Sequence, residues 1–181
     1  SSGIAVGPAF VLSRGRPSIV RRSIAPEQVD VEVERLRVAI EESRKEVEGV
    51  RHALGKIADE ESDSEEEMKL LLEAHFLMHS DALLVEAAVK TIRTERVNAA
   101  FALRRTVDLL AAKMRALDSD YMKERAVDFE HVGDQVLRHL TGTQLPAVEE
   151  GCIVLAHDLS PADAIRVLHP GGAVGVATVA G

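Results

Sequence analysis

The sequence predicts a mostly helical α+β fold, in which an antiparallel helical bundle is inserted into an α/β unit. In the long middle of the chain, apolar residues recur at alternating spacings of three and four, the heptad pattern of packed helices. The two ends are instead short apolar runs broken by glycine and proline, which favour strands. Because strand-like segments flank the helical part, we expect an α/β domain over 1–20 and 143–181 and a bundle over 21–142.

The two ends predict a small sheet with one helix. Strands are expected within Gly3–Leu12, Gly151–Ala156 and Ala173–Ala180. Between the last two, Ser160 is placed to cap a short helix with Pro161 at its first position.

The middle predicts a series of helices joined by short connections. The apolar stripe of the first helix is broken only at Ser43, and Ser64 with Glu67 forms a capping box at the start of the second. The helices are expected from Pro26 to Ala58, over 65–79, from Ala82 to Glu95, from the cap Asn98 onward, and within Asp118–Leu140, where Asp118, Ser119 and Asp120 are all candidate caps.

One glycine predicts a close contact between helices. Gly133 lies inside the apolar stripe of the last helix, where glycine costs about 1 kcal/mol of helix propensity relative to alanine. We therefore expect another element to approach the backbone closely at this position.

Composition excludes several classes of protein. The net charge of −8 argues against a nucleic-acid partner, which would need a basic face. No apolar run is long enough to span a membrane, and the first residues do not form a signal sequence. The lone cysteine, Cys152, lies in an apolar run and is expected to be a core residue. These features predict a cytoplasmic protein without membrane contact.

One motif resembles a known family. Residues 121–128, Tyr-Met-Lys-Glu-Arg-Ala-Val-Asp, and the Val-Gly pair at 132–133 resemble the signature of enzyme I, the phosphoenolpyruvate–protein phosphotransferase of the bacterial sugar phosphotransferase system. Residues 154–181 are similar to the same family, so the resemblance covers nearly the whole chain.

The resemblance implies a function for the parent enzyme. In that family the bundle binds the histidine phosphocarrier protein HPr, and a swivelling phosphohistidine domain of α/β type carries the histidine that accepts the phosphoryl group of phosphoenolpyruvate. That histidine is expected beyond Gly181, so no catalytic residue and no cofactor is expected here, and this fragment alone is predicted to be inactive. Magnesium and homodimer formation are implied for the parent, through a C-terminal domain that these residues do not include.

The resemblance also implies a docking surface for HPr. An apolar centre, an acidic rim and a polar anchor from Arg125 are expected, and Arg125→Glu or Leu84→Asp should abolish docking while the bundle stays folded. The implied contact residues are Glu66, Glu67, Leu71, His75, Met78, Asp81, Leu84 and Arg125. The chain departs from the family pattern at His79, Ala82, Leu83, His131 and Gln135, which leaves the nitrogen-regulatory branch of the family open.

The histidines offer few further candidates. His75 and His79 have the i, i+4 spacing of a metal-binding pair, but no third ligand is identifiable, so no metal site is predicted. Neither His157 nor His169 occupies the phosphoryl-accepting position of the family. We expect partly exposed helix positions for His52, His131 and His139.

Two further readings remain open at this stage. One is a non-catalytic helical interaction module whose α/β ends serve as a base. The other is a swivelling domain like that of pyruvate phosphate dikinase, which would not need the inserted bundle.

Overall fold

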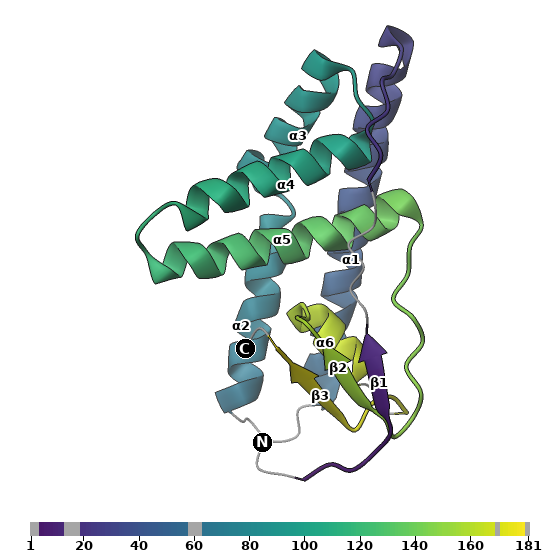
Figure 1. The fold of residues 1–181 in the computed structure, drawn as a ribbon, viewed down its shortest axis with the longest axis vertical. Coiled ribbons are helices and arrows are strands. Elements are labelled where there is room, and N and C mark those ends of the chain that lie inside the picture. Colours follow the sequence, from purple (N-terminus) through teal and green to yellow (C-terminus); the bar gives the residue numbers. More distant parts are fainter. Residues whose placement is uncertain (1–3, 13–18, 58–62, 169–170, 180–181) are drawn as a thin grey trace.

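The computed structural model describes residues 4–12, 19–57, 63–168 and 171–179. In the view of Figure 1, α3, α4 and α5 lie above a small sheet, α1 and α2 extend down to the level of that sheet, and the α4–α5 hairpin projects to one side. Within the described residues, no helix has both the length and the apolar character needed to cross a membrane.

The helices form two antiparallel layers that cross each other (Figure 1). After a short 3-10 turn at Pro26–Gln28, α1 (Val29–Ile57) runs antiparallel to α2 (Asp63–Met78) and α3 (Ala82–Glu95). The hairpin of α4 (Ala99–Arg115) and α5 (Asp120–Thr141) lies across them. The predicted antiparallel bundle is therefore confirmed, and its helices begin and end close to the predicted residues.

The sheet contains strands from both ends of the chain. β1 (Ala9–Leu12), β2 (Ile153–Ala156) and β3 (Gly175–Thr178) are parallel and lie in that order. Ala9 is paired with Ile153, so neighbouring strands are separated in sequence by the whole helical part. This pairing confirms the inserted architecture, while the residue boundaries of the two domains remain a prediction.

The helix between β2 and β3 has the predicted start. In α6 (Pro161–Val167), Ser160 is the N-cap, and its hydroxyl oxygen accepts a hydrogen bond from the backbone N–H of Asp163 at 3.1 Å. The hydroxyl therefore satisfies an amide that would otherwise have no partner in the first turn.

Close packing at Gly133 confirms the prediction made from the helical stripe. A Cβ atom at this position would lie only 2.5 Å from Cγ2 of Val107 on α4. Glycine thus permits α4 and α5 to approach each other more closely than alanine would.

A smaller hydrophobic core, separate from that of the crossed helices, lies between the sheet and α6. Cys152 is buried in this core, as predicted.

The start of α4 differs from the prediction. Asn98 occupies the N-cap position, but its Oδ1 accepts from the backbone N–H of Arg22 at 2.8 Å. Glu32 on α1 accepts instead from the N–H of Ala99 at 2.7 Å. A carboxylate from another helix therefore satisfies the first turn of α4.

The start of α5 has one of its predicted caps. The hydroxyl oxygen of Ser119 accepts from the backbone N–H of Met122. At the start of α2, the side chain of Ser64 lies outside the described residues, so its predicted capping box stays a prediction.

The break in the α1 stripe has a partner on α2. Ser43 is buried, and its hydroxyl lies 2.8 Å from Nε2 of His79. Nδ1–H of His79 donates to the carbonyl oxygen of His75 at 2.7 Å, so Nε2 is the acceptor for Ser43. A hydrogen bond inside the core accounts for serine at a heptad position.

Candidate functional site

The acidic rim of the predicted docking surface is accessible. Glu66 and Glu67 are exposed on α2, and Leu71 is 43% exposed one turn later. Asp81 is half-buried, because it caps α3 by accepting from the N–H of Leu83 at 2.8 Å. These four side chains lie where a partner can reach them.

The predicted apolar centre is wrong in part. Met78 is 1% exposed, and Leu84 and His75 are 0% exposed. Met78 and Leu84 belong to the main core cluster, which also contains Phe129 of α5. They are buried because the end of α2 and the first turn of α3 pack on the crossing hairpin. Leu84→Asp would place a charge in this core, so we expect it to unfold the bundle rather than abolish docking selectively.

The exposed apolar residues of α2 and α3 are adjacent in sequence to the predicted ones. Leu70, Leu77 and Leu83 are 66%, 63% and 58% exposed. Leu70 and Leu77 are seven residues apart, so they share one face of α2, next to the face that carries the buried His75 and Met78. The sequence showed that α2 is apolar on several sides but did not show which side is covered.

Arg125 is unusual among the buried or half-buried arginines of the bundle. It is half-buried, and its guanidinium carbon lies 5.8 Å from the centre of the Phe129 ring. It forms no ion pair with any residue that the structure describes, whereas the half-buried Arg51 and Arg104 contact Glu48 and Asp134, each at 2.8 Å. Arg125 therefore has hydrogen-bond donors available for an external acceptor.

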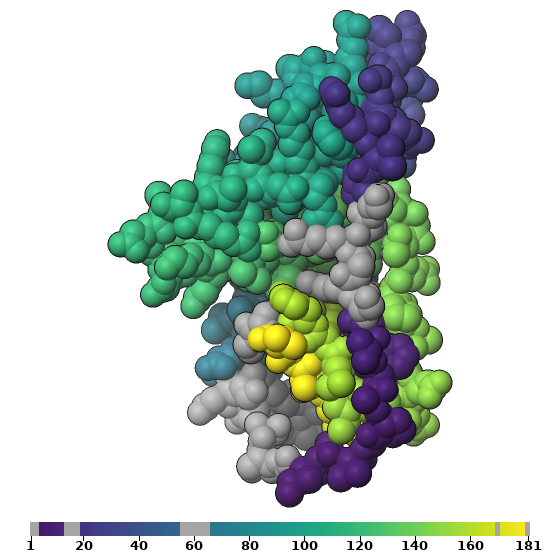
Figure 2. Space-filling view, viewed as in Figure 1, coloured from purple at the N-terminus to yellow at the C-terminus, as the bar shows by residue number. Residues whose placement is uncertain are grey.

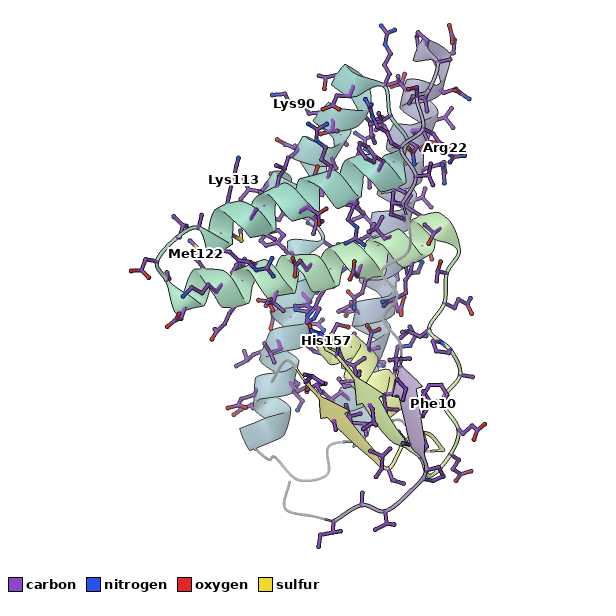
Figure 3. The ribbon with its side chains drawn as sticks, viewed as in Figure 1. Phe10, Arg22, Lys90, Lys113, Met122 and His157 are labelled. Atoms are coloured by element: carbon purple, nitrogen blue, oxygen red, sulfur yellow. The ribbon has the colours of Figure 1, made fainter. Side chains whose placement is uncertain are left out.

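Arg125 lies near the projecting end of the α4–α5 hairpin. Figure 3 labels Met122, three residues earlier, at this end of α5. The hairpin extends beyond α2 in the space-filling view of Figure 2. On the other side of Arg125 in the sequence, Asp128 contacts His75, which fixes the last turn of α2 against this part of α5.

A row of polar residues on α5 is hydrogen-bonded to the three-stranded sheet and its helix α6, which together we call the sheet unit. Nε2–H of His131 donates to Asp158 at 2.6 Å, Gln135 donates to Ser160 at 3.3 Å, and Arg138 donates to Asp163 at 2.8 Å. We call these α5 residues and their partners the junction row. Positions 131, 135 and 138 share one face of α5, and their partners follow one another from the end of β2 into α6.

Sequence reasoning missed the junction row. His131 was expected to be partly exposed but is buried, and with Gln135 it was noted only as a departure from the family pattern. Their i, i+4 spacing together with Arg138 was the available signal. His52 is exposed and His139 is partly accessible, and Nε2–H of His139 donates to Glu46 at 2.8 Å.

The remaining histidines are now placed. Burial lowers the pKa of His79 to about 4, although the hydrogen bond to the His75 carbonyl opposes that shift. His79 is therefore neutral near pH 7, and both ring nitrogens are engaged within the core. His157 is exposed at the carboxyl end of β2 (Figure 3), and His169 lies outside the described residues.

His75 has different neighbours from those that its spacing with His79 indicated. Nε2 of His75 lies 3.3 Å from Oδ1 of Asp128, and the rings of His75 and His131 have their centres 6.0 Å apart. One potential ligand atom from each of His75, Asp128 and His131 lies within 4.8 Å of the others. The structure thus brings together a cluster that includes only one member of the pair noted in the sequence.

Comparison with known proteins places the chain in a family. The family model for the N-terminal part of PEP-utilising enzymes matches residues 1–125. The chain belongs to this family.

Two similar curated proteins are full-length phosphotransferases. The chain is 33% identical over 171 residues to the phosphoenolpyruvate-protein phosphotransferase of Geobacillus stearothermophilus and 32% identical to that of Bacillus subtilis (strain 168). Each alignment covers 92% of this chain but 28% of the relative, so the chain spans less than a third of their length.

Solved structures support the same assignment. An NMR solution structure of Enzyme I superposes with a TM-score of 0.76 at 31% identity, covering 98% of this chain and 70% of that one. The N-terminal domain of the nitrogen Enzyme 1 gives a TM-score of 0.67 at 21% identity, covering 96% and 69%, and this likeness concerns the fold alone. The chain is therefore similar to the N-terminal portion of enzyme I.

Proposed function

We propose that this segment is the docking part of an enzyme I–type phosphoenolpyruvate–protein phosphotransferase, and that its partner is an HPr-type phosphocarrier. The half-buried, unpaired guanidinium of Arg125 is the observation on which the proposal depends most. In a chain with a net charge of −8, a cation without a carboxylate partner among the described residues is available to a partner's acceptor groups.

The proposed docking surface combines this cation with apolar and acidic groups. Leu71, Leu77 and Leu83 supply exposed apolar area on α2 and α3. The acids that were predicted from the family, Glu66, Glu67 and Asp81, offer complementarity to a basic partner, which favours fast association. Met78, Leu84 and His75 support the surface from within the core instead of touching the partner.

The chemistry of the proposed parent enzyme requires only a brief encounter. The phosphoryl group would pass from phosphoenolpyruvate to a histidine of the parent, and then to a histidine of the docked carrier. Each turnover needs release of the carrier, so a small interface with a polar rim suits this role. In this proposal the accepting histidine belongs to the parent outside the 181 residues, and the segment itself contributes docking and positioning.

Magnesium is assigned to the parent and not to this segment. Among the described residues, the one cluster of potential metal ligands contains two imidazoles. Mg²⁺ prefers an octahedral set of oxygens, so these residues do not fit it.

Two departures from the family pattern, at His131 and Gln135, do not bear on the choice between the sugar and nitrogen branches, whereas a third, Leu83, lies on the proposed docking surface. His131 and Gln135 face the sheet unit through Asp158 and Ser160, away from any partner. They therefore bear on the internal junction, and the identity of the carrier depends on the exposed residues of α2, α3 and α5.

A titration of isotope-labelled HPr with the segment tests the proposal. We expect saturable chemical-shift changes. Arg125→Glu should weaken binding at least tenfold, because it removes the guanidinium donors and places a carboxylate against the partner's acceptor groups. Arg93→Glu is the matched control, since Arg93 is an exposed arginine of α3 whose guanidinium lies 3.8 Å from Asp30. An absence of shift changes at millimolar concentration, or equal losses in both variants, would contradict the proposal.

A further inference from the structure

The cluster of His75, Asp128 and His131 has the composition of a transition-metal site. Two imidazoles and one carboxylate suit Zn²⁺ and similar late first-row ions, whereas Mg²⁺ and Ca²⁺ prefer oxygen ligands alone. Asp128 and His131 are three residues apart on α5, a spacing at which a carboxylate and a histidine of one helix project together toward a metal in helical bundles. His75 approaches them from α2.

The distances are compatible with one ion. Two ligands of a tetrahedral Zn²⁺, at bond lengths of about 2.0–2.1 Å, lie about 3.3 Å apart. Nε2 of His75 and Oδ1 of Asp128 are 3.3 Å apart. All three ligand atoms lie within 4.8 Å of one another, which exceeds that spacing by about 1.5 Å, a distance that small side-chain rotations can close.

The burial of His75 supplies a second and independent observation. Its side chain is 0% exposed, and its Nδ1 has no hydrogen-bond partner among the described residues. Buried imidazoles normally satisfy both nitrogens, as His79 does four residues later. The hydrogen bond from His75 to Asp128 is also long for a contact with a carboxylate. Nε2, which faces Asp128 through this long contact, is the atom available to an ion, and binding there would leave Nδ1–H as a donor.

The surroundings of His131 fit the same role. Nε2–H of His131 donates to Asp158 at 2.6 Å. A carboxylate of this kind commonly orients an imidazole that binds a metal and raises its basicity. Asp158 comes from the segment after β2, so an ion bound to His131 would be connected to the sheet unit as well as to α2.

We propose that His75, Asp128 and His131 together bind one Zn²⁺ ion, or a chemically similar late transition-metal ion, between α2 and α5. Three protein ligands leave a fourth position for water or an incoming side chain. The ion would cross-link α2 to α5 directly beneath the proposed docking surface. This inference does not depend on the identity of the docking partner.

Calorimetric titration of the 181-residue protein, after removal of metals with a chelator, tests the site. With Mg²⁺ present in excess, we expect one Zn²⁺ per chain and a melting temperature that rises with Zn²⁺ concentration. Co²⁺ in place of Zn²⁺ should give the visible absorption of a four-coordinate ion. In NMR spectra, the ring signals of His75 and His131 should shift while those of His79 stay unchanged.

Two variants and two controls decide the assignment. Asp128→Asn and His131→Asn should each weaken Zn²⁺ binding at least tenfold, and Asp128→Asn decides the matter if the other variant fails to fold. Asp108→Asn and His52→Asn alter exposed residues of the same types and should leave binding unchanged. Absence of saturable one-to-one binding, unchanged affinity in Asp128→Asn, or ring shifts confined to other histidines would overturn the proposal.

Discussion

Gly133 and Ser43 each lie at a contact between two helices: Gly133 of α5 packs against Val107 of α4, and Ser43 of α1 is hydrogen-bonded to His79 of α2. Gly133 and Ser43 stood out because each interrupts an apolar stripe, and each interruption proved to be a packing or hydrogen-bonding contact. The burial of His75 and His131 was not visible, because it depends on how α2 and α5 cross. A stripe identifies the buried face of a helix, but the side chains at the edge of that face are covered or exposed according to the neighbouring helix.

The neutral imidazole of His79 predicts a loss of stability in acid. Its pKa is about 4 in the folded protein, against an ordinary value near 6.5, because burial disfavours the charged form. Between these pH values the unfolded chain therefore binds more protons than the folded protein. The contribution of neutral His79 to the free energy of unfolding is fully present above pH 6.5 and is lost as the pH decreases toward 4. The loss from this group should approach about 3 kcal/mol.

Urea denaturation between pH 7 and pH 4.5 measures this effect. The fall in unfolding free energy should be smaller in His79→Gln, because glutamine does not titrate, and His52→Gln serves as the exposed control. An identical pH dependence of the wild type and His79→Gln would show that His79 is not the titrating group.

At the scale of elements, the sequence predicted most of the fold. Heptad spacing located the helices, and glycine, proline and capping residues located their ends. The error at α4 has a clear cause: Asn98 is a good cap by type, but Arg22 occupies its acceptor and Glu32 reaches Ala99 from α1. Local sequence does not reveal that a side chain from a distant helix replaces the N-cap residue as the acceptor for the first turn.

Replacing a glycine by alanine should have opposite effects at Gly133, which is packed against α4, and at Gly49, which is not packed against another element. Gly133→Ala should destabilise the protein by up to about 2 kcal/mol, because overlap with Val107 costs about 1–3 kcal/mol and alanine regains about 1 kcal/mol of helix propensity. Gly49→Ala on α1 should instead stabilise it by up to about 1 kcal/mol, since nothing lies near the added methyl group. Thermal and urea unfolding measure both changes.

The reason for the Gly133 effect is open to a direct check. In a Val107→Ala background the overlap disappears, so Gly133→Ala should become stabilising by about 0.5–1 kcal/mol. If Gly133→Ala remained equally destabilising in that background, the contact with Val107 would not be its cause.

For the whole molecule, the sequence predicted that a bundle is inserted into an α/β unit but not how the two are joined. The junction row consists of side-chain pairs separated by 25 to 27 residues, and such pairs leave no periodic signal. Of the candidate site, the acidic residues and Arg125 proved accessible, whereas Met78, Leu84 and His75 proved buried. The resemblance implied which residues would contact a partner, and tertiary packing determined which of those side chains are exposed.

Loss of the Arg138–Asp163 pair should loosen the sheet unit selectively. The side chain of Asp163 is fully buried, so Arg138→Leu would remove an ion pair from a buried carboxylate, at a cost of up to about 3–5 kcal/mol. Hydrogen–deuterium exchange should accelerate for the amides of β2 and α6 and remain slow in the centre of α4. Arg115→Leu, which removes a more exposed pair with Glu130, should not accelerate exchange in β2 or α6. Uniform acceleration throughout the chain would argue against a selective role for the junction row.

The pairing of β1 with β2 has a consequence for protein synthesis. In the described residues β1 is bonded to β2 alone, and the ribosome must complete every helix of the crossed layers before β2 emerges. The nascent amino-terminal strand therefore waits with unsatisfied backbone groups while the helices, whose contacts are more local, can already form. Gly7 and Pro8 directly precede β1 and suit this interval, because they discourage premature association with the strands of neighbouring chains.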